Sequence, residues 1–362
     1  MSRFFSSRNA RLTPYTPGEQ PQNRRYIKLN TNESPFPPSP MAVERAAQEA
    51  ANLQLYSDPE CRALRAEAAA CFHLGTDEML FTNGSDEILD FAVRAFCSEG
   101  FPLICPDITY GFYPVFADAY AIQKIELPLT EAFEICLADY RDIRGLVMIA
   151  NPNAPTGIAK SREVLEAFIA EDPNRIVLID EAYVDFGAES CVSLIRKYDN
   201  LIVTQTFSKS RSLAGGRLGM GFACPELIAD LTAIKYSFNP YNVNRMTMAA
   251  GVGALQDRTY FETCCLQIMD VREYFVEKLR SLDFQVLPSS ANFVFARSPD
   301  IGGKALYEQL KARGILIRHF ETARLKDWNR ISIGTRAQMD ALLAAIQELR
   351  LLNNTTPKED EP

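Results

Sequence analysis

Hydrophobic residues change their spacing along this chain, and each spacing predicts a different kind of element. Between residues 79 and 222, short apolar runs alternate with stretches in which apolar residues recur every three or four positions. Such runs predict buried strands, and the wider spacing predicts helices packed on them. The predicted strands are Pro102–Cys105, Gly145–Ala150, Arg175–Ile179 and Leu201–Thr204, and the predicted helices are Asp86–Cys97, Phe112–Tyr120 and Ser161–Ala170. This alternation predicts an α/β fold with a mainly parallel sheet and helices on both faces.

The segment before this region has another pattern. Residues 1–40 are rich in Pro, Asn, Ser and Thr, so we expect an arm that lies on the surface without regular structure. Helical spacing follows at Val43–Leu53 and Arg62–Phe72, and Asp58 with Pro59 predicts the cap and first turn of the second helix.

The segment after Phe222 is first helical and then mixed. Its predicted helices are Pro225–Lys235, Val243–Leu255, Thr259–Leu282, Gly303–Ala312 and Arg336–Leu351, and its predicted strands are Phe284–Leu287, Asn292–Ala296, Ile315–Arg318 and Arg330–Ile333. We therefore expect a large domain over 41–256 and a small α+β domain over 257–352. The 1–40 arm is expected to belong with the small domain, and 353–362 to be a disordered tail.

Composition narrows the class of protein. The chain has 362 residues, 47% hydrophobic and 23% charged, as is usual for a globular protein, and its net charge of −8 argues against a nucleic-acid surface. It has no apolar run that could span a membrane and no secretory signal pattern, so we expect a cytoplasmic protein. Nine cysteines without a CxxC pair, and two histidines, predict reduced thiols and no metal site.

Ligands of parallel sheets bind at the carboxyl ends of the strands, so polar residues there are candidates. Gly84, Ser85 and Asp86 form a small turn that opens a helix, which suits a phosphate, although an ordinary helix cap is the alternative. Tyr110 could stack on an aromatic ligand or simply pack at the edge of the core. The loop 151–157, NPNAPTG, is held by two prolines and a glycine, and serves either as a turn or to present asparagines.

Two further strand ends carry charge. Asp180 directly follows an apolar run, where a carboxylate needs a partner such as a protonated pyridine nitrogen; its alternative role is a helix cap. Tyr183, three residues later, could contact the same ligand. Lys209 lies at the mouth of the sheet, where an amine loses its proton more readily and can attack an aldehyde, although a solvated lysine is the alternative. The hydroxyl and guanidinium groups nearby that could bind a phosphate belong to Thr206, Ser208 and Arg217.

Together these motifs resemble the class I and II aminotransferases among the fold type I pyridoxal 5′-phosphate enzymes. The resemblance implies that Lys209 holds the cofactor as a Schiff base and that Asp180 pairs with its pyridine nitrogen. It further implies that Tyr183 binds the ring hydroxyl and that Tyr110 stacks on the ring. The phosphate would be surrounded by Gly84, Ser85, Asp86, Thr206, Ser208 and Arg217.

One position departs from the family pattern. The family has an asparagine directly before Pro-Thr-Gly that contacts the ring hydroxyl, and this chain has Ala154 there. One alternative is that Asn153 replaces this asparagine. The other is that the hydrogen bond is missing, so that binding of the ring hydroxyl depends more on Tyr183. We expect that Asn153 reaches the ring.

The resemblance extends over almost the whole chain and is most specific to the histidinol-phosphate aminotransferase family. It is carried by the segments PYTPGEQP, LNTNESP, YSDPECRALR, FTNGSDEILDFAVRAF, DEAYVDF, GILIRHF and NRISIGT. It implies that Arg330 binds a substrate carboxylate, that Arg318 and Tyr15 lie near a substrate phosphate, and that Asn32 lies near the substrate. Tyr56 would reach the cofactor phosphate of a second subunit, so a homodimer with shared sites is expected.

The implied reaction is reversible amino transfer between L-histidinol phosphate and 2-oxoglutarate. Threonine-phosphate decarboxylation and aromatic amino acid transamination are alternatives on the same scaffold. A regulator that binds the cofactor without catalysis is an alternative of another class.

Overall fold

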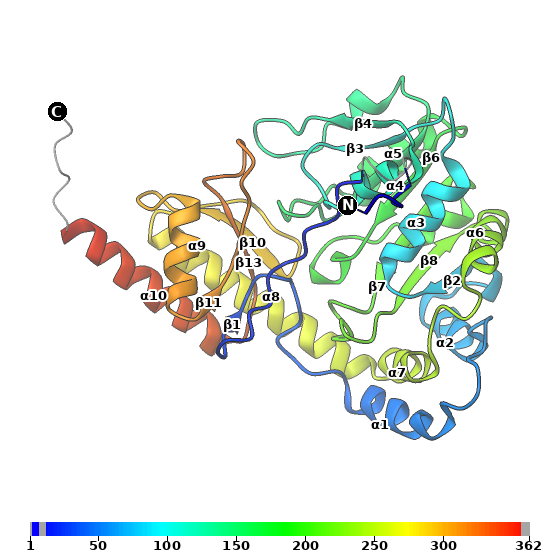
Figure 1. The fold of residues 1–362 in the computed structure, drawn as a ribbon, viewed down its shortest axis with the longest axis horizontal. Helices are drawn as coiled ribbons and strands as arrows, with labels where there is room; N and C mark the ends of the chain where they lie inside the picture. The colour runs from blue at the N-terminus through cyan, green and yellow to red at the C-terminus, as the bar shows by residue number, and fades with distance from the viewer. Residues whose placement is uncertain (1, 7–11, 356–362) are drawn as a thin grey trace.

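The computed structural model describes residues 2–6 and 12–355, and Figure 1 shows two parts joined by the long helix α8. The larger part is built on a seven-stranded sheet. Its strands are β2 (Met79–Thr82), β3 (Leu103–Pro106), β4 (Lys124–Leu127), β5 (Leu146–Ala150), β6 (Ile176–Asp180), β7 (Leu201–Thr206) and β8 (Gly219–Ala223).

The order of this sheet is β2-β8-β7-β6-β5-β3-β4. Strands β7, β6, β5, β3 and β4 pair in parallel, and β8 runs antiparallel to both β2 and β7. The prediction of a mainly parallel α/β sheet is therefore confirmed. Strand β8 (GMGFA) was not predicted, because its two glycines interrupt the apolar run.

Helices cover both faces of the sheet because buried side chains alternate along each strand. In β5, Leu146 and Met148 join a core with α3 (Ser85–Phe96), α4 (Tyr113–Tyr120) and α6 (Pro225–Phe238). Val147 and Ile149 join the opposite core. That second core contains residues of α1 (Pro40–Glu49), α2 (Arg62–Phe72), α5 (Arg162–Glu171) and α7 (Arg245–Gln256).

The smaller part has its own hydrophobic core. Its elements are α8 (Arg258–Ser281), α9 (Gly303–Ala312) and α10 (Arg336–Thr355), with β9 (Gln285–Val286), β10 (Phe293–Arg297), β11 (Ile315–Leu316), β12 (Arg318–His319) and β13 (Asn329–Ser332). Antiparallel pairing gives the order β12-β13-β10-β9. Short 3-10 helices η2 (Ala50–Asn52), η3 (Thr76–Glu78), η4 (Leu137–Tyr140), η5 (Val184–Phe186) and η6 (Val192–Arg196) complete the described elements.

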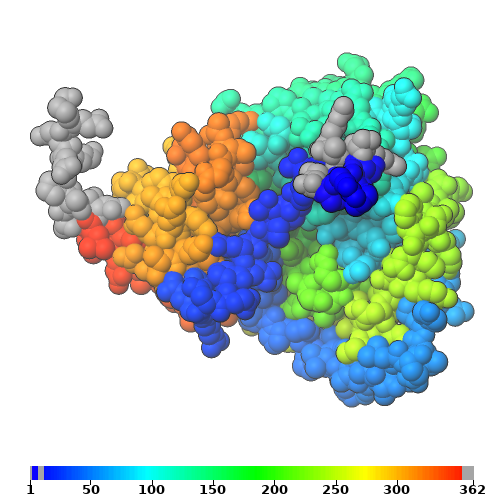
Figure 2. Space-filling model, in the orientation of Figure 1, coloured from blue at the N-terminus to red at the C-terminus, as the bar shows by residue number. Residues whose placement is uncertain are grey.

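The N-terminal segment contains one short strand, β1 (Ile27–Lys28), which pairs in parallel with β11 of the smaller part. Figure 2 shows this blue segment lying along the boundary between the orange and the cyan-green parts. The division at 1–40, 41–256, 257–352 and 353–362 stays a prediction. The separate cores and the β1–β11 pairing support it, whereas residues 1, 7–11 and 356–362 lie outside the described part.

Two local predictions were wrong. Pro59 is not in the first turn of α2, because residues 58–61 form a turn and the cap position is Cys61. The Asp58 carboxylate nevertheless accepts from the Arg62 amide at 3.0 Å. The single strand expected at Ile315–Arg318 is divided between two sheets, because β11 pairs with β1 and β12 pairs with β13.

Within the described residues, no helix combines the length and the apolarity needed to cross a bilayer.

Candidate active site

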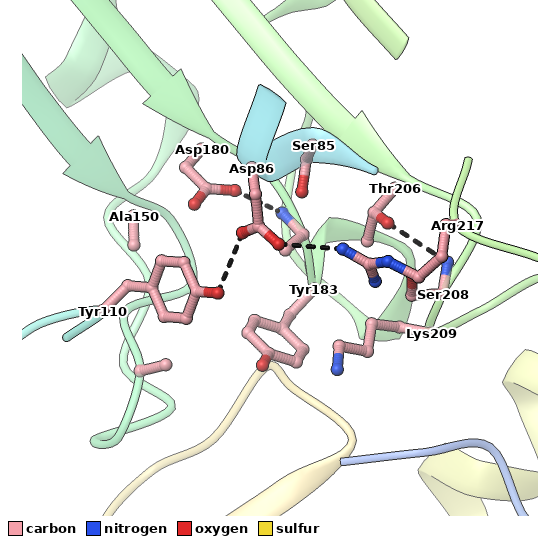
Figure 3. Close-up of a pocket in the computed structure, with 12 residues that line it drawn as sticks. Ser85, Asp86, Tyr110, Ala150, Asp180, Tyr183, Thr206, Ser208, Lys209 and Arg217 are labelled. Carbon is pink, nitrogen blue, oxygen red and sulfur yellow. Dashed lines mark hydrogen bonds and ion pairs between the residues drawn. The ribbon is translucent and has the colours of Figure 1, made fainter. Parts of the chain in front are cut away.

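The carboxyl ends of β5, β6 and β7 meet at one edge of the sheet, and a cavity opens there. It is enclosed by small, hydroxyl and charged side chains (Figure 3). They belong to Ser85, Asp86, Tyr110, Ala150, Ala154, Asp180, Ala182, Tyr183, Thr206, Ser208, Lys209 and Arg217. Segments from five separate stretches of sequence are thus brought together by the order of the strands.

The N-terminus of α3 faces this cavity. Gly84 caps the helix with φ 80°, which glycine adopts without strain. Gly219 of β8 lies directly behind it: a Cβ on Gly219 would be 2.4 Å from the Ser85 nitrogen. The free amides of a helix N-terminus bind anions, so this tight backbone packing presents an anion site to the cavity.

The Asp86 carboxylate connects two walls of the cavity. It accepts from Arg217 Nη2 at 2.9 Å and from the Tyr110 hydroxyl at 2.8 Å, as Figure 3 shows. Burial, reinforced by the Asp86 charge, raises the pKa of Tyr110, so its hydroxyl stays protonated as a donor. The two contacts fix the Tyr110 ring and the Arg217 guanidinium at opposite sides of the cavity.

Asp180 ends strand β6 as a buried carboxylate, 4% exposed. The Tyr113 hydroxyl donates to Oδ2 at 2.9 Å, and the Ala182 amide donates to Oδ1 at 3.2 Å. Burial raises the pKa of Asp180 to about 6, although both donors act to lower it. A cation beside this carboxylate would compensate for the lost hydration, so the site is suited to a positively charged ligand atom.

Lys209 follows β7 and reaches the same cavity. Its Nζ donates to the backbone oxygen of Thr31 at 3.3 Å and lies 5.8 Å from the centre of the Tyr183 ring. Ser208 is 5% exposed, and its buried Oγ has no hydrogen-bond partner within the described part of the chain. Buried hydroxyls are normally satisfied, so this one indicates a missing ligand acceptor or donor.

A second, wider cavity adjoins the first and shares Tyr110, Ala154, Tyr183 and Lys209 with it. Its other walls come from the N-terminal segment, the 107–111 loop and the smaller part of the molecule. They include Tyr15, Thr16, Gly18, Thr31, Asn32, Asp107, Ile108, Thr109, Gly111, Pro155, Arg318, Phe320, Thr322, Ala323, Arg324, Leu325 and Arg330.

Two arginines of this wider cavity, Arg330 and Arg318, differ in their hydrogen bonds to the protein. Arg330 donates through Nη2 to the backbone oxygen of Asn30 at 3.0 Å, while its buried Nε has no hydrogen-bond partner among residues 2–6 and 12–355. Burial lowers the pKa of Arg330 below its usual value. Among the residues that the structure describes, Arg318 makes two long hydrogen bonds, 3.3 Å to Thr16 O and 3.5 Å to Pro17 O. Both guanidinium groups can therefore bind an anion without breaking a strong contact.

Comparison with known proteins identifies the family. Residues 24–346 match the family described as aminotransferase class I and II. The chain belongs to this family. It is 47% identical over 356 residues to a histidinol-phosphate aminotransferase of Acetobacter pasteurianus, covering 98% of this chain and 100% of the relative. It is 45% identical to one of Acinetobacter baylyi, covering 95% and 97% respectively. The aminotransferase fold predicted from the motifs is thus confirmed.

A solved structure gives the same picture of the fold. The histidinol-phosphate aminotransferase from Sinorhizobium meliloti in complex with pyridoxal-5′-phosphate superposes with a TM-score of 0.84 at 27% identity. The match covers 91% of this aminotransferase and 92% of the other chain.

Most of the predicted site residues of this aminotransferase line the two cavities. Gly84 contacts neither directly but lies against Arg217, since a Cβ there would be 2.6 Å from Nη2. Tyr56 is far more exposed, at 81%, and stacks on Tyr241 with ring centres 4.8 Å apart. It is not among the residues that line either cavity.

Asn153, which was expected to reach the cofactor ring, is not among the residues that line either cavity. Its Oδ1 accepts from Thr109 Oγ1 at 2.8 Å, and its Nδ2 donates to Ile108 O at 3.0 Å. The side chain is buried and holds the 107–111 loop, whereas the methyl group of Ala154 faces both cavities.

Two residues of this aminotransferase site were missed from the sequence. Tyr113 lies three residues after Tyr110, at the start of α4, and the sequence analysis placed it in the predicted helix Phe112–Tyr120 without a role in the site. Arg324 lines the wider cavity and donates to the backbone oxygens of Leu129 and Thr130 at 3.0 and 2.7 Å. No spacing in the sequence relates Arg324 to those two residues.

Proposed function

We propose that this aminotransferase transfers an amino group reversibly between L-histidinol phosphate and 2-oxoglutarate, with pyridoxal 5′-phosphate as cofactor. The observation that carries the substrate is the 47% and 45% identity, over nearly the full chain, to relatives of that name. Arginines at one wall of a cleft that also contains a lysine agree with this, because both substrates are anionic.

The residues present fit the cofactor. At one end of the narrower cavity, the α3 N-terminus, Arg217 and the unpartnered Ser208 hydroxyl suit a phosphate. At the other end, the buried Asp180 carboxylate suits a protonated ring nitrogen. The small side chains of Ala150, Ala154 and Ala182 leave room for a flat ring beside Tyr110. When bound, pyridoxal phosphate supplies an aldehyde that accepts the amino group and a ring that withdraws electrons.

Three side chains would do the chemical work. Lys209 would hold the cofactor covalently through Nζ and, once displaced by the substrate amine, accept the proton at the substrate carbon and return it. Asp180 would keep the proton on the ring nitrogen, since its charged form is stabilised by that cation. Tyr183, which lines both cavities, would donate to the ring's phenolic oxygen.

The wider cavity would bind and orient the substrates. The buried Arg330, with an unpartnered Nε, is placed to form a planar double contact with the carboxylate of glutamate or 2-oxoglutarate. Arg318 would exchange its long contacts with Thr16 and Pro17 for the substrate phosphate, close to Tyr15. Asn32 lines the same cavity.

We also propose a cytoplasmic homodimer with shared sites. The exposed Tyr56 lies with Leu53, Leu55 and Tyr241 in a set of exposed apolar side chains, as expected of a surface that a second copy covers. Nine free cysteines are consistent with a reducing compartment.

The test is to supply the purified protein with L-histidinol phosphate and 2-oxoglutarate and to measure glutamate. We expect glutamate to form, and Lys209→Ala to abolish its formation together with the visible absorption of the bound cofactor while the fold is retained. A roughly 10³-fold or larger loss is usual when a covalent catalytic group is removed.

The alternatives give different products. Release of carbon dioxide from threonine phosphate without glutamate formation would contradict the proposal, as would a clear preference for aromatic amino acids. A protein that binds the cofactor but changes no absorption on addition of any amino donor would be a regulator. If the Lys209→Ala variant still carries covalently bound cofactor, detected by its visible absorption, then another residue holds the cofactor.

A further inference from the structure

The hydroxyl group of Tyr183 is held by hydrogen bonds whose direction can be followed outward from the backbone. The Asn32 backbone N–H donates to Ser332 Oγ at 2.9 Å. Because this hydroxyl oxygen accepts from the amide, its own proton is free, and it donates to Asn32 Oδ1 at 2.9 Å. The side-chain amide of Asn32 therefore turns its nitrogen toward Tyr183.

The orientation of the Asn32 side-chain amide decides where the Tyr183 hydroxyl can donate its proton. Asn32 Nδ2 donates to the Tyr183 hydroxyl at 2.9 Å, so the phenol oxygen is an acceptor there and its single proton remains for another partner. With the Asn32 amide reversed, Tyr183 would donate to Asn32 instead. Two N–H groups would then face Ser332 Oγ, and in the described part of the chain its proton would have no other acceptor.

The group is rigid. Asn32 is 1% exposed, and its backbone oxygen accepts from Asn292 Nδ2 at 2.9 Å. Its φ of 56° is a left-handed conformation that asparagine tolerates better than most residues. Ser332, 2% exposed, belongs to β13 and donates through its backbone N–H to Leu29 at 3.0 Å. The amide nitrogen is thus fixed by the packing of the N-terminal segment against the smaller part.

Position 154, on the neighbouring wall, carries an alanine, whose side chain has no hydrogen-bond donor. Ala154 stands where the family pattern has an asparagine that contacts the ring hydroxyl, and its methyl group packs with Ala291, Phe293 and Tyr183. Asn153 cannot take over, because its amide is bound to the 107–111 loop.

We propose that Asn32 and Ser332 are positioning residues that direct the Tyr183 proton to the phenolic oxygen of the cofactor ring, in place of the donor missing at Ala154. The inference rests on the proposed cofactor. A donor to that oxygen weakens its hold on the proton it shares with the nitrogen supplied by Lys209. Loss of the donor therefore raises the pH at which the visible absorption of the holoenzyme changes.

The experiment compares Ser332→Ala, Tyr183→Phe and the double variant as holoenzymes. Visible absorption is titrated with pH, and the affinity of each apoenzyme for pyridoxal phosphate is measured by equilibrium dialysis. We expect Tyr183→Phe to raise the midpoint by about one pH unit, the size of one hydrogen bond to a charged group. Ser332→Ala should raise it by roughly half as much and should add nothing once Tyr183 is phenylalanine.

Controls separate positioning from folding. The charged and titratable groups that line the two cavities together with Tyr183 are unchanged in every variant; they are Tyr15, Asp86, Asp107, Tyr110, Asp180, Lys209, Arg217, Arg318, Arg324 and Arg330. Ser298→Ala, which removes another buried serine of the smaller part, should leave the midpoint unchanged. Ala154→Asn should return the midpoint of Ser332→Ala toward that of the unmodified enzyme.

Three results would overturn the inference. These are a Ser332→Ala midpoint equal to that of the unmodified enzyme, a shift of the same size with and without the Tyr183 hydroxyl, and a Ser332→Ala midpoint that Ala154→Asn does not restore. If the unmodified protein retains no visible absorption after it is mixed with pyridoxal phosphate and the free cofactor is removed, the proposed function itself is contradicted, and this inference with it.

Discussion

At the scale of single residues, the site depends on polar groups kept in low-dielectric surroundings with defined partners. Asp180 is the clearest case, because its burial disfavours the charge that its proposed role requires. Two donors, Tyr113 and Ala182, reduce that penalty without removing it. The cofactor cation is then what makes the ionised form stable, so ligand binding and the protonation of Asp180 are coupled.

This coupling predicts how the stability of the apoprotein depends on pH. The pKa of Asp180 is about 6 in the fold and about 3.9 in an unfolded chain, so the folded state binds more protons between these values. The contribution of Asp180 to the free energy of unfolding is present at low pH and is lost as the pH rises from about 4 to about 6. We expect Asp180→Asn to remove this loss, on the order of 3 kcal/mol, in denaturant unfolding.

The neighbouring Glu181, whose burial also raises its pKa to about 7, is present in both proteins and cancels in the comparison. The same pH dependence in both apoproteins would show that Asp180 ionises freely in the fold.

A second residue-scale prediction concerns Tyr113. Tyr113→Phe removes the donor to Asp180 Oδ2 but keeps the ring that packs edge-on to Tyr110. A carboxylate with one donor fewer holds the ring proton less well, so kcat should fall about tenfold, the effect of one hydrogen bond to a charged group. Tyr140→Phe, an equally buried tyrosine without a contact to the site, should leave kcat unchanged.

At the scale of elements, the anion site depends on how closely β8 approaches the start of α3. Thr82 of β2 and Thr206 of β7 both pair with Gly219, which lies between them. The backbone of Gly84 and Ser85 then packs directly on that glycine. Strand β8, which lies between β2 and β7, thus sets the position of the α3 N-terminus.

This contact predicts a specific effect of Gly219→Ala. The added methyl group would lie 2.4 Å from Gly84 C and Ser85 N, so α3 must move. We expect a loss of about 1–3 kcal/mol in the free energy of unfolding and at least a tenfold weaker affinity for pyridoxal phosphate. Gly215→Ala, in the loop beside the site with nothing within 4 Å of the new Cβ, is the matched control. Equal cofactor affinities of the two variants would contradict this account of the anion site.

At the scale of the whole molecule, residues far apart in sequence form one cleft. The N-terminal segment supplies Tyr15 and Asn32, the large sheet supplies Lys209, and the smaller part supplies Arg318 and Arg330. Tyr56 remains outside it, exposed beside Tyr241. The proposed dimer would complete the site with the Tyr56 of a second copy.

Subunit complementation tests this. If Tyr56 serves the other subunit, Lys209→Ala and Tyr56→Ala should each be impaired alone. Dissociating and reassociating an equal mixture should restore about a quarter of the normal sites, because half of the dimers are mixed and each has one intact site. Assembly is checked by light scattering. Activity of the mixture no higher than the mean of the two variants would show that each site is built within one chain.

The candidate site was largely predictable because its residues follow strand ends. Asp180 directly follows an apolar run, Tyr110 and Lys209 lie in the loops that follow two others, and the carboxyl ends of parallel strands meet at one edge. Strand β8 and the division of 315–318 were not predictable. Each depends on which strands lie beside it, and the local pattern of hydrophobic residues does not contain that information.

The sequence by itself determined the α/β class, the aminotransferase motifs and the order of the charged groups along the chain, since these depend on local spacing and residue type. The tertiary structure alone decided which side chain near a motif faces the cavity. Asn153 turns away because the 107–111 loop offers its amide better partners, and Ala154 faces inward. The contact between Asn32 and Ser332, 300 residues apart, likewise arises only when the N-terminal segment packs against β13. A hydrogen bond depends on distance and direction in space, which the spacing of residues along a chain does not specify.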